Sequence, residues 1–357
     1  MNKKLVFENG RSFLGYGFGA DVETVQEVVF DTQVVGYQEI MSDPSYCAQI
    51  VCMTYPLIGN YGLADEDYEA KTSKIGGFIV RDYNDSPSNF RYTKTLAQEL
   101  EENGIPGISG VDTRAITRML RDEGTMRAII CDVNVSVEEA QERISAVSIP
   151  HDHVERVSSK KVWYSRTANY KYNVVAIDCG IKHNIVRSLN EIGCNVTIVP
   201  HNTSAEKIMG MRPDGILVSN GPGDPEDIPE VVALVAELQG KVPMFGIGLG
   251  HQMMALAAGA ETAKLKQGHR GANQPVRQVE GTRTYITSQN HGYAVDAESV
   301  TAGTVSFVNV NDGTCEGIDY PDKKAFSVQF DPDICESIRD TYFLFDRFAD
   351  LMKGGDR

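Results

Sequence analysis

The stretch 174–260 restricts the fold most, because short apolar runs and amphipathic runs alternate along it. Each apolar run has the length and the β-branched content of a buried strand, and each following run repeats its apolar residues at helical spacing. The four pairs are NVVAIDCG with IKHNIVRSLNEIG, CNVTIVP with TSAEKIMGM, DGILVSNG with PEDIPEVVALVAELQG, and VPMFGIG with HQMMALAAGA. Strands that alternate with helices pair in parallel, so this region is predicted to form an open, mostly parallel sheet with helices on both faces.

The rest of the chain predicts a second, mixed α/β domain before this sheet. The runs KLVFENG, EVVFDTQVV and AQIVCMTY are typical of strands, whereas LAQELEENG and RAITRMLRDEG have helical periodicity and end at glycine. Between them and the sheet, the pattern weakens over 136–172. The fold class is therefore α/β, with an N-terminal domain at 1–135, a linker at 136–172 and a C-terminal domain at 173–357, which ends in several strands and an amphipathic helix.

Composition excludes several classes of partner and site. A net charge of −15 argues against nucleic acid and against anionic membrane surfaces. No apolar run reaches the roughly 18 residues of a membrane span, and no apolar segment follows MNKK, so a cytoplasmic protein is expected. Seven scattered cysteines without a CxxC pair favour neither a zinc site nor disulfides. His151 and His153 are interpreted as loop residues, so no metal site is expected.

The segment FGIGLGHQMM, residues 245–254, is predicted to pass from a strand through a tight turn into a helix. Hydrolytic enzymes hold a nucleophile at such turns, because the turn lifts one side chain above the sheet and directs the following N–H groups at an oxyanion. The residue at the apex is Gly248, which has no side chain. No GxGxxG or GxxxxGKS follows any predicted strand, so no nucleotide-binding loop is expected.

A second loop, SNGPGDP, also follows a predicted strand, and ligands bind at the carboxyl ends of parallel strands. The two loops are therefore expected to face one pocket. The glycines and prolines of SNGPGDP would let a ligand approach the backbone closely. An ordinary tight turn, with Asp224 capping the next helix, explains the loop equally well.

Two further segments carry polar groups, and each has a simpler explanation. TSQNHGYAV offers amide, imidazole and backbone donors around Gly292, but a β-hairpin turn would also use Asn and Gly. VQFDPD places Asp331 and Asp333 on either side of Pro332, which by itself is only the polar end of a strand.

Taken together, the motifs resemble the small subunit family of carbamoyl phosphate synthetases over almost the entire chain. The segments that carry the resemblance are GYQEIMSDPSY, YPLIGNYG, GIPGISGVDTRAITRMLRDEG, IDCGIKHNIVRSL, SNGPGDP, GLGHQ, GHRGAN and TSQNHGYAVD. The resemblance implies that the C-terminal domain is a class I glutamine amidotransferase domain. In that family a cysteine at the tight turn between the strand and the helix, called the elbow below, attacks the side-chain amide of glutamine. A histidine held by a glutamate moves the proton.

The resemblance also implies a partner and a set of binding positions. Ammonia passes to a large subunit, which makes carbamoyl phosphate from bicarbonate and ATP, so ATP and magnesium are expected only there and no cofactor is expected in this chain. The amides of Gly223 and Leu249 are the expected oxyanion donors. The positions carried over for L-glutamine binding are Ser45, Gly221, Gly223, Leu249, Gln252, Asn290, Gly292 and Tyr293.

The catalytic positions depart from the family's pattern. Gly248 stands where the family has cysteine, and Asp331 and Asp333 stand where it has histidine and glutamate. Gln274 replaces a further histidine. Glycine cannot form a thioester, and a carboxylate with a reference pKa near 3.9 is a poor substitute for imidazole in shuttling a proton near neutral pH. Glutamine hydrolysis is therefore expected to be lost.

Three functions remain open at this level. The first is a structural or activating subunit, in a heterodimer with a large subunit that uses free ammonia. The second is a module that senses glutamine without hydrolysing it. The third is an active amidotransferase that uses another nucleophile, for which Cys179 and Cys335 are the candidates. Whether the pathway served is arginine or pyrimidine biosynthesis is not distinguished.

Overall fold

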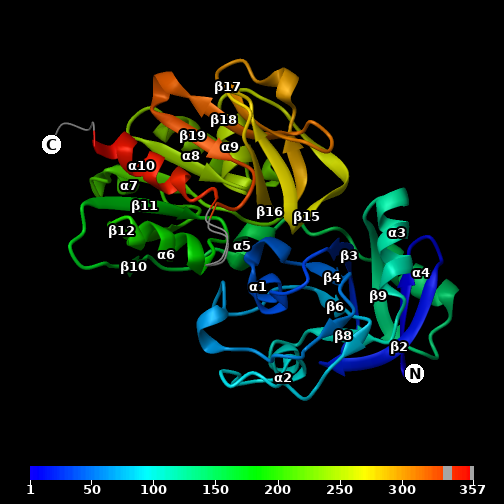
Figure 1. The fold of residues 1–357 in the computed structure, drawn as a ribbon. Helices are drawn as coiled ribbons and strands as arrows, with labels where there is room; N and C mark the ends of the chain where they lie inside the picture. Colours follow the sequence, from blue (N-terminus) through cyan, green and yellow to red (C-terminus); the bar gives the residue numbers. More distant parts are fainter. Residues whose placement is uncertain (333–339, 354–357) are drawn as a thin grey trace. The chain divides into compact units, whose positions relative to one another are not determined.

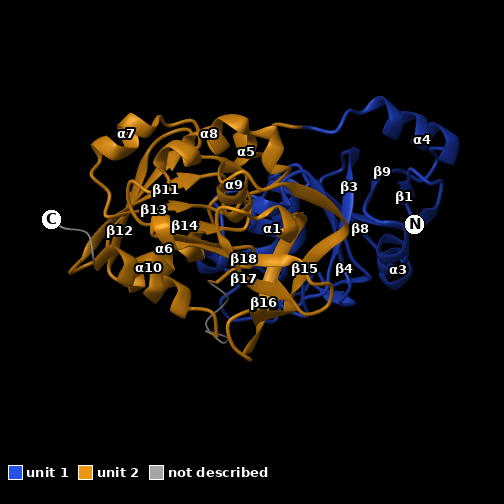
Figure 2. Cartoon of the chain, turned by 90° about the horizontal axis from the view of Figure 1, so that it is seen from above, with its two compact units in different colours: residues 1–150 blue, residues 151–357 orange. Residues whose placement is uncertain are grey.

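The structure, a computed structural model, describes residues 1–332 and 340–353 (Figure 1). The chain divides into two compact units, residues 1–150 and 151–357 (Figure 2). The division falls inside the segment predicted as a linker, whose helix α4 (Val137–Ala146) belongs to the first unit, whereas α5 (His153–Val157) and strand β10 (Trp163–Ser165) belong to the second.

The first unit is built on a closed barrel with strand order β1-β2-β8-β6-β4-β3-β9. The strands are β1 (Lys3–Phe7), β2 (Ser12–Gly19), β3 (Thr24–Asp31), β4 (Gln49–Met53), β6 (Gly77–Ile79), β8 (Pro106–Ser109) and β9 (Met126–Asp132). The three segments predicted as strands form β1, β3 and β4. Closure depends on the antiparallel pairing of β1 with β9 and on the pairing of β2 with β8, which join distant parts of the sequence.

The helices of this unit begin and end at the residues that favour those positions. Besides α1 (Tyr37–Ser42) and α4, they are α2 (Leu96–Glu102) and α3 (Thr113–Glu123). Thr95 and Gln98 form a capping box at the start of α2, and the Asp112 side chain caps α3. Gly124, with φ 102°, ends α3. Side chains of α3 pack with alternate residues of the barrel strands in one apolar cluster, and α1 and α2 pack in another.

The second unit contains a ten-stranded sheet with order β10-β12-β11-β13-β14-β19-β18-β16-β15-β17. Its central strands pair in parallel: β12 (Cys194–Pro200), β11 (Tyr172–Asp178), β13 (Gly215–Val218), β14 (Met244–Ile247) and β19 (Ala325–Val328). The sheet continues through antiparallel strands: β18 (Cys315–Tyr320), β16 (Thr284–Val295), β15 (Thr262–Gln278) and β17 (Thr304–Asn309). The predicted parallel sheet is thus confirmed for the alternating region.

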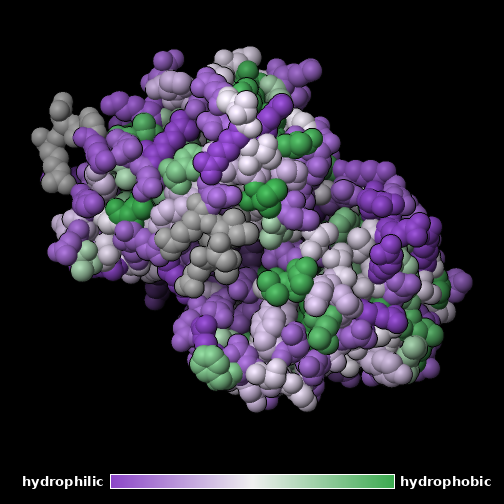
Figure 3. Space-filling model, viewed as in Figure 1, coloured by the Kyte–Doolittle hydropathy of each residue, from purple (hydrophilic) through white to green (hydrophobic). Residues whose placement is uncertain are grey.

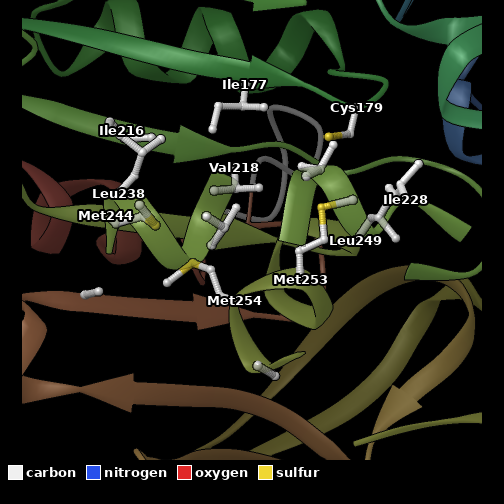
Figure 4. Close-up of a cluster of buried hydrophobic side chains, with 14 of the residues drawn as sticks. Ile177, Cys179, Ile216, Val218, Ile228, Leu238, Met244, Leu249, Met253 and Met254 are labelled. Atoms are coloured by element: carbon white, nitrogen blue, oxygen red, sulfur yellow. The ribbon is translucent and has the colours of Figure 1, made fainter. Parts of the chain in front are cut away.

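Helices cover both faces of the parallel strands. Successive residues of a strand point to opposite faces, so Val175 and Ile177 pack in one apolar cluster while Val174 and Ala176 pack in the other. The first cluster contains side chains of α7 (Ala205–Gly210), α8 (Pro229–Leu238) and α9 (Leu249–Ala257), some of which Figure 4 shows. The second contains side chains of α6 (His183–Glu191) and α10 (Phe343–Lys353).

The surface gives no sign of a membrane span. Within residues 1–332 and 340–353, no helix is both long enough and apolar enough to cross a membrane. On the face drawn in Figure 3, hydrophobic residues form only scattered patches among hydrophilic ones.

Candidate functional site

Gly248 lies at the turn between β14 and α9, as the strand-turn-helix prediction requires. Its backbone angles are φ 57° and ψ −112°, a conformation that residues other than glycine rarely adopt. Two hydrogen bonds hold the turn between neighbouring strand ends: Gly248 N donates to Val328 O at 2.9 Å, and Gly250 N donates to Ser219 O at 3.0 Å. Glycine therefore occupies without strain a position that would strain any other residue.

The space beside Gly248 could still hold a side chain. A Cβ atom built there would lie 3.4 Å from Asn220 Cβ, 3.5 Å from Asn220 Cα and 3.9 Å from Gln329 O, which are ordinary contacts. A Cβ atom at Gly250 would instead lie 2.1 Å from Val218 O, which is a severe clash. Glycine is thus required at 250, because two backbones approach each other closely there. At 248 there is room for a side chain, so space alone does not require glycine.

The loop SNGPGDP lies against the elbow, because Asn220 supplies the atoms nearest to the built Cβ of Gly248. The two loops therefore lie side by side, whereas the expectation that they face one pocket stays a prediction. The tight-turn explanation holds as well: Asp224 Oδ1 accepts a hydrogen bond from Glu226 N at 3.0 Å and caps the short helix η3 (Pro225–Asp227). Gly223 has φ 89°, and a Cβ at Gly221 would lie 2.2 Å from Cys179 O. Both glycines are thus required by the backbone itself.

Asp331, which is predicted to stand at the position of the family's histidine, forms a largely buried ion pair. Lys182 Nζ donates to Asp331 Oδ2 at 3.0 Å, and the two side chains are 9% and 14% exposed. Lys182 is the residue before α6, and its backbone N–H donates to Asn220 Oδ1 at 3.2 Å. The backbone N–H of Asp331 donates to Ser288 O of β16 at 3.0 Å. Oδ2 of Asp331 thus already accepts a charge-assisted hydrogen bond from Lys182.

Lys182 is the residue that sequence reasoning missed. It lies in the segment DCGIKHN, which was used only for the family resemblance and for Cys179 as a candidate nucleophile. Lys182 and Asp331 are 149 residues apart in the sequence, so no local pattern links them. Asp333 lies outside the described residues, as does Cys335.

Cys179, the other candidate nucleophile, is unsuited to the role. Its side chain is fully buried, and burial raises the pKa of the thiol well above its ordinary value. Only the thiolate is an effective nucleophile, so this environment keeps the sulfur unreactive. The other described cysteines are also buried and free of disulfides, as expected for small core residues.

The positions carried over from the family on β16 belong to a continuous strand. Asn290 pairs with Arg270 of β15, and Tyr293 pairs with Lys264. The hairpin-turn explanation of this segment is therefore wrong. The physical reason is that a long ladder with β15 pairs these residues, and the irregularity is taken up by a shift of register between Lys264 and His269.

Gln252 connects the first turns of α9 to this strand. Its buried Nε2 donates to Tyr293 O and to Gln329 Oε1, both at 2.8 Å. Two side-chain amide nitrogens nearby, Asn290 Nδ2 and Gln329 Nε2, are buried without a hydrogen-bond partner in the described part of the chain. Buried donors of this kind are rarely left unpaired, so they are candidates for contacts with a ligand.

Two buried histidines of the second unit, His251 and His291, are neutral. His251 is fully buried, its Nδ1 lies 2.8 Å from Ser327 Oγ, and burial lowers its pKa to about 3. Burial, and then the neighbouring His269, lower the pKa of His291 well below its ordinary value. His151 is exposed and lies 2.7 Å from Asp227 Oδ1, in keeping with a loop residue.

Ser45 lies in the first unit, in the short helix η1 (Pro44–Tyr46). Its backbone N–H donates to Asp43 Oδ1 at 2.8 Å, which fixes the start of that helical turn. Its assignment to glutamine binding stays a prediction.

Comparison with known proteins identifies relatives for both units. Residues 5–130 match the family model described as carbamoyl-phosphate synthase small chain, CPSase domain, and residues 175–351 match glutamine amidotransferase class-I. The chain is 48% identical to a carbamoyl phosphate synthase small chain of Bacillus caldolyticus, over 99% of this chain and 97% of the relative. It is 46% identical to that of Oceanobacillus iheyensis, over 98% and 96%. Among solved structures, a glutamine amidotransferase from Thermotoga maritima covers 52% of this chain and 85% of its own, with 18% identity and a TM-score of 0.39.

Proposed function

Because the chain belongs to the carbamoyl phosphate synthase small-chain family, we propose that it is a small subunit whose own glutaminase chemistry has been lost. The observation that carries the proposal is Gly248 at the apex of the elbow. The glutaminase route begins with a thioester between a cysteine sulfur and the side-chain carbonyl of glutamine. Gly248 has no atom that could form that bond, so the covalent route is closed whatever its neighbours do.

The proton-transfer part of the route is closed independently. A general base must bind a proton from the nucleophile and later give it to the leaving ammonia. Asp331 Oδ2 instead accepts a hydrogen bond from Lys182 Nζ at 3.0 Å. The amides of Gly223 and Leu249 could still polarise a bound carbonyl. By analogy with serine proteases stripped of their triads, that leaves a rate about 10³ to 10⁴ above water, far below the rate of an intact triad.

The remaining role is toward the large subunit. We propose that the chain docks on a carbamoyl phosphate synthase large subunit, which binds ATP and magnesium and takes up free ammonia. Both units of the chain match family models, and the match with small chains spans nearly its whole length. The chain thus matches 97% of the length of a small chain, while the apex of its elbow is a glycine.

Carbamoyl phosphate formation by the complex is expected with ammonium chloride and not with glutamine. The purified chain would be mixed with the large subunit from its own source, and product would be measured with each nitrogen donor. The matched control is the Cys179→Ala variant in the same complex. Glutamine-dependent synthesis that is present in the parent and lost in Cys179→Ala or in Cys335→Ala would contradict the proposal, because it would identify a displaced nucleophile.

A glutamine-sensing module is the second candidate, and the unpaired amide nitrogens of Asn290 and Gln329 favour it. Titration of the complex with L-glutamine in a calorimeter is expected to give saturable binding without release of glutamate. Asn290→Ala is expected to weaken that binding about fivefold, since one hydrogen bond to a ligand contributes about 1 kcal/mol. Absence of any binding heat at millimolar glutamine, with ammonia-dependent synthesis intact, would leave only the structural role.

A further inference from the structure

Three side chains of types that can bind a metal meet inside the antiparallel part of the second unit's sheet, at the strand segment Asn290–Tyr293. They are His269 of β15, His291 of β16 and Glu316 of β18, which are 9%, 7% and 0% exposed. One potential ligand atom from each lies within 4.8 Å of the other two. No other group of three or more such residues was found in the described part of the chain.

The proton of His291 is fixed by its backbone partner. Nδ1 lies 2.7 Å from the carbonyl oxygen of Tyr293, which can only accept a hydrogen bond, so Nδ1 carries the hydrogen. In a neutral ring Nε2 then has a free lone pair. That lone pair lies 3.1 Å from Gln289 Oε1, which is also an acceptor. A cation between the cluster's acceptors would remove this mismatch.

His269 is oriented in the same way by a carboxylate. Its Nε2 lies 2.9 Å from Asp312 Oδ2, so in a neutral ring the hydrogen belongs on Nε2 and the lone pair of Nδ1 is directed at the cluster. Nδ1 lies 3.1 Å from Gln289 Oε1 and 3.4 Å from Glu316 Oε1. The arrangement therefore turns two imidazole lone pairs, a carboxylate and an amide oxygen toward one point.

This is the pattern of metal-binding histidines, whose second ring nitrogen donates to a carboxylate or a backbone carbonyl. Two histidines and one glutamate form a known zinc ligand set with an open fourth position. Gln289 Oε1 lies 3.1 Å from both imidazole nitrogens and could occupy that position. The carboxylates of Glu316 and Asp312 would balance a double positive charge. We propose that His269 Nδ1, His291 Nε2 and Glu316 bind one divalent transition-metal ion of the zinc class, with Gln289 Oε1 as the fourth ligand.

The site would be structural, because all of its protein ligands are buried and leave little room for a reacting water. The ion would link β15, β16 and β18 directly beside Asn290 and Gly292. From the sequence alone, no metal site is expected in this chain. Spacing could not reveal the site, since its ligands come from three strands that only the folded sheet brings together.

Metal content tests the proposal on the whole chain without reference to activity. The protein would be stripped with a chelator, dialysed and titrated with Co²⁺ while its visible absorption is followed, and bound zinc would be counted by elemental analysis. One equivalent is expected, with the intense absorption bands of tetrahedral Co²⁺. Glu316→Gln and His269→Asn are each expected to bind at least about 100-fold more weakly, whereas His151→Asn, an exposed histidine outside the cluster, is expected to bind as the parent does.

Two results would overturn the proposal. One is a chelator-treated parent that takes up less than one equivalent of either ion at micromolar concentration. The other is uptake that both ligand variants retain in full, which would place the ion elsewhere. If Glu316→Gln fails to fold, the number of metal ions bound per parent chain and the metal affinity of His269→Asn still decide the question, since His269 is less buried than Glu316. In either contrary case the cluster is a hydrogen-bonded network that holds a proton instead of a metal.

Discussion

The triple variant Gly248→Cys, Asp331→His, Asp333→Glu is expected to regain glutamine hydrolysis, measured as glutamate release by the complex with the large subunit. A side chain at 248 fits, because its Cβ would lie no closer than 3.4 Å to any neighbouring atom. A histidine at 331 removes the carboxylate that Lys182 binds and supplies a base. The rise over the parent is expected to be at least about 10² to 10⁴-fold, the range that general acid–base catalysis alone contributes.

The single variants show which part of the loss matters. Gly248→Cys alone is expected to remain at least about 100-fold below the triple variant, because Asp331 stays bound to Lys182 and no imidazole activates the thiol. The control for effects on packing is the triple variant Gly248→Ala, Asp331→His, Asp333→Glu, which has alanine at 248 where the active variant has cysteine. A folded triple variant as inactive as the parent would show that other changes, such as Gln274, also block the reaction.

The alternating pattern of 174–260 was sufficient to predict the parallel strands and the elbow, because both depend on local periodicity and on turn residues. The barrel was not predicted, since its closure depends on β1 pairing with β9 and on β2 pairing with β8. A local pattern shows that a segment is a strand but not which strand it pairs with. The first unit was therefore predicted only as mixed α/β.

The same limit applies to the site. The residues of the elbow could be named from the sequence because they are neighbours in it. The Lys182–Asp331 pair could not, because its members are brought together by β11, β19 and the loops that follow them. From the sequence, the segment around Asn290 could be either a hairpin turn or a strand with binding residues. Only the pairing of β16 with β15 in the structure excludes the turn.

The variant Gly250→Ala is expected to destabilise the second unit severely, by about 3–5 kcal/mol. Its Cβ would lie 2.1 Å from Val218 O and 2.6 Å from Val218 C, which are backbone atoms of β13 and cannot rotate away. Helix α9 would have to move off the sheet, and the hydrogen bond from Gly250 N to Ser219 O would be lost. Urea unfolding followed by fluorescence measures this, because the chain's single tryptophan, Trp163, lies in the second unit.

Gly248→Ala is the matched comparison, since it makes the same change two residues away. Its Cβ has room, so the expected cost is only the backbone strain at φ 57°, about 1–3 kcal/mol. Equal losses in the two variants would contradict the distinction between a glycine required by close packing and one that only relieves strain. If Gly248→Ala is less stable than the parent, glycine at this position stabilises the elbow relative to a residue with a side chain. Under the proposed loss of the nucleophile, a change from cysteine to glycine would have carried a gain in folding stability, and introducing a cysteine would reverse that gain.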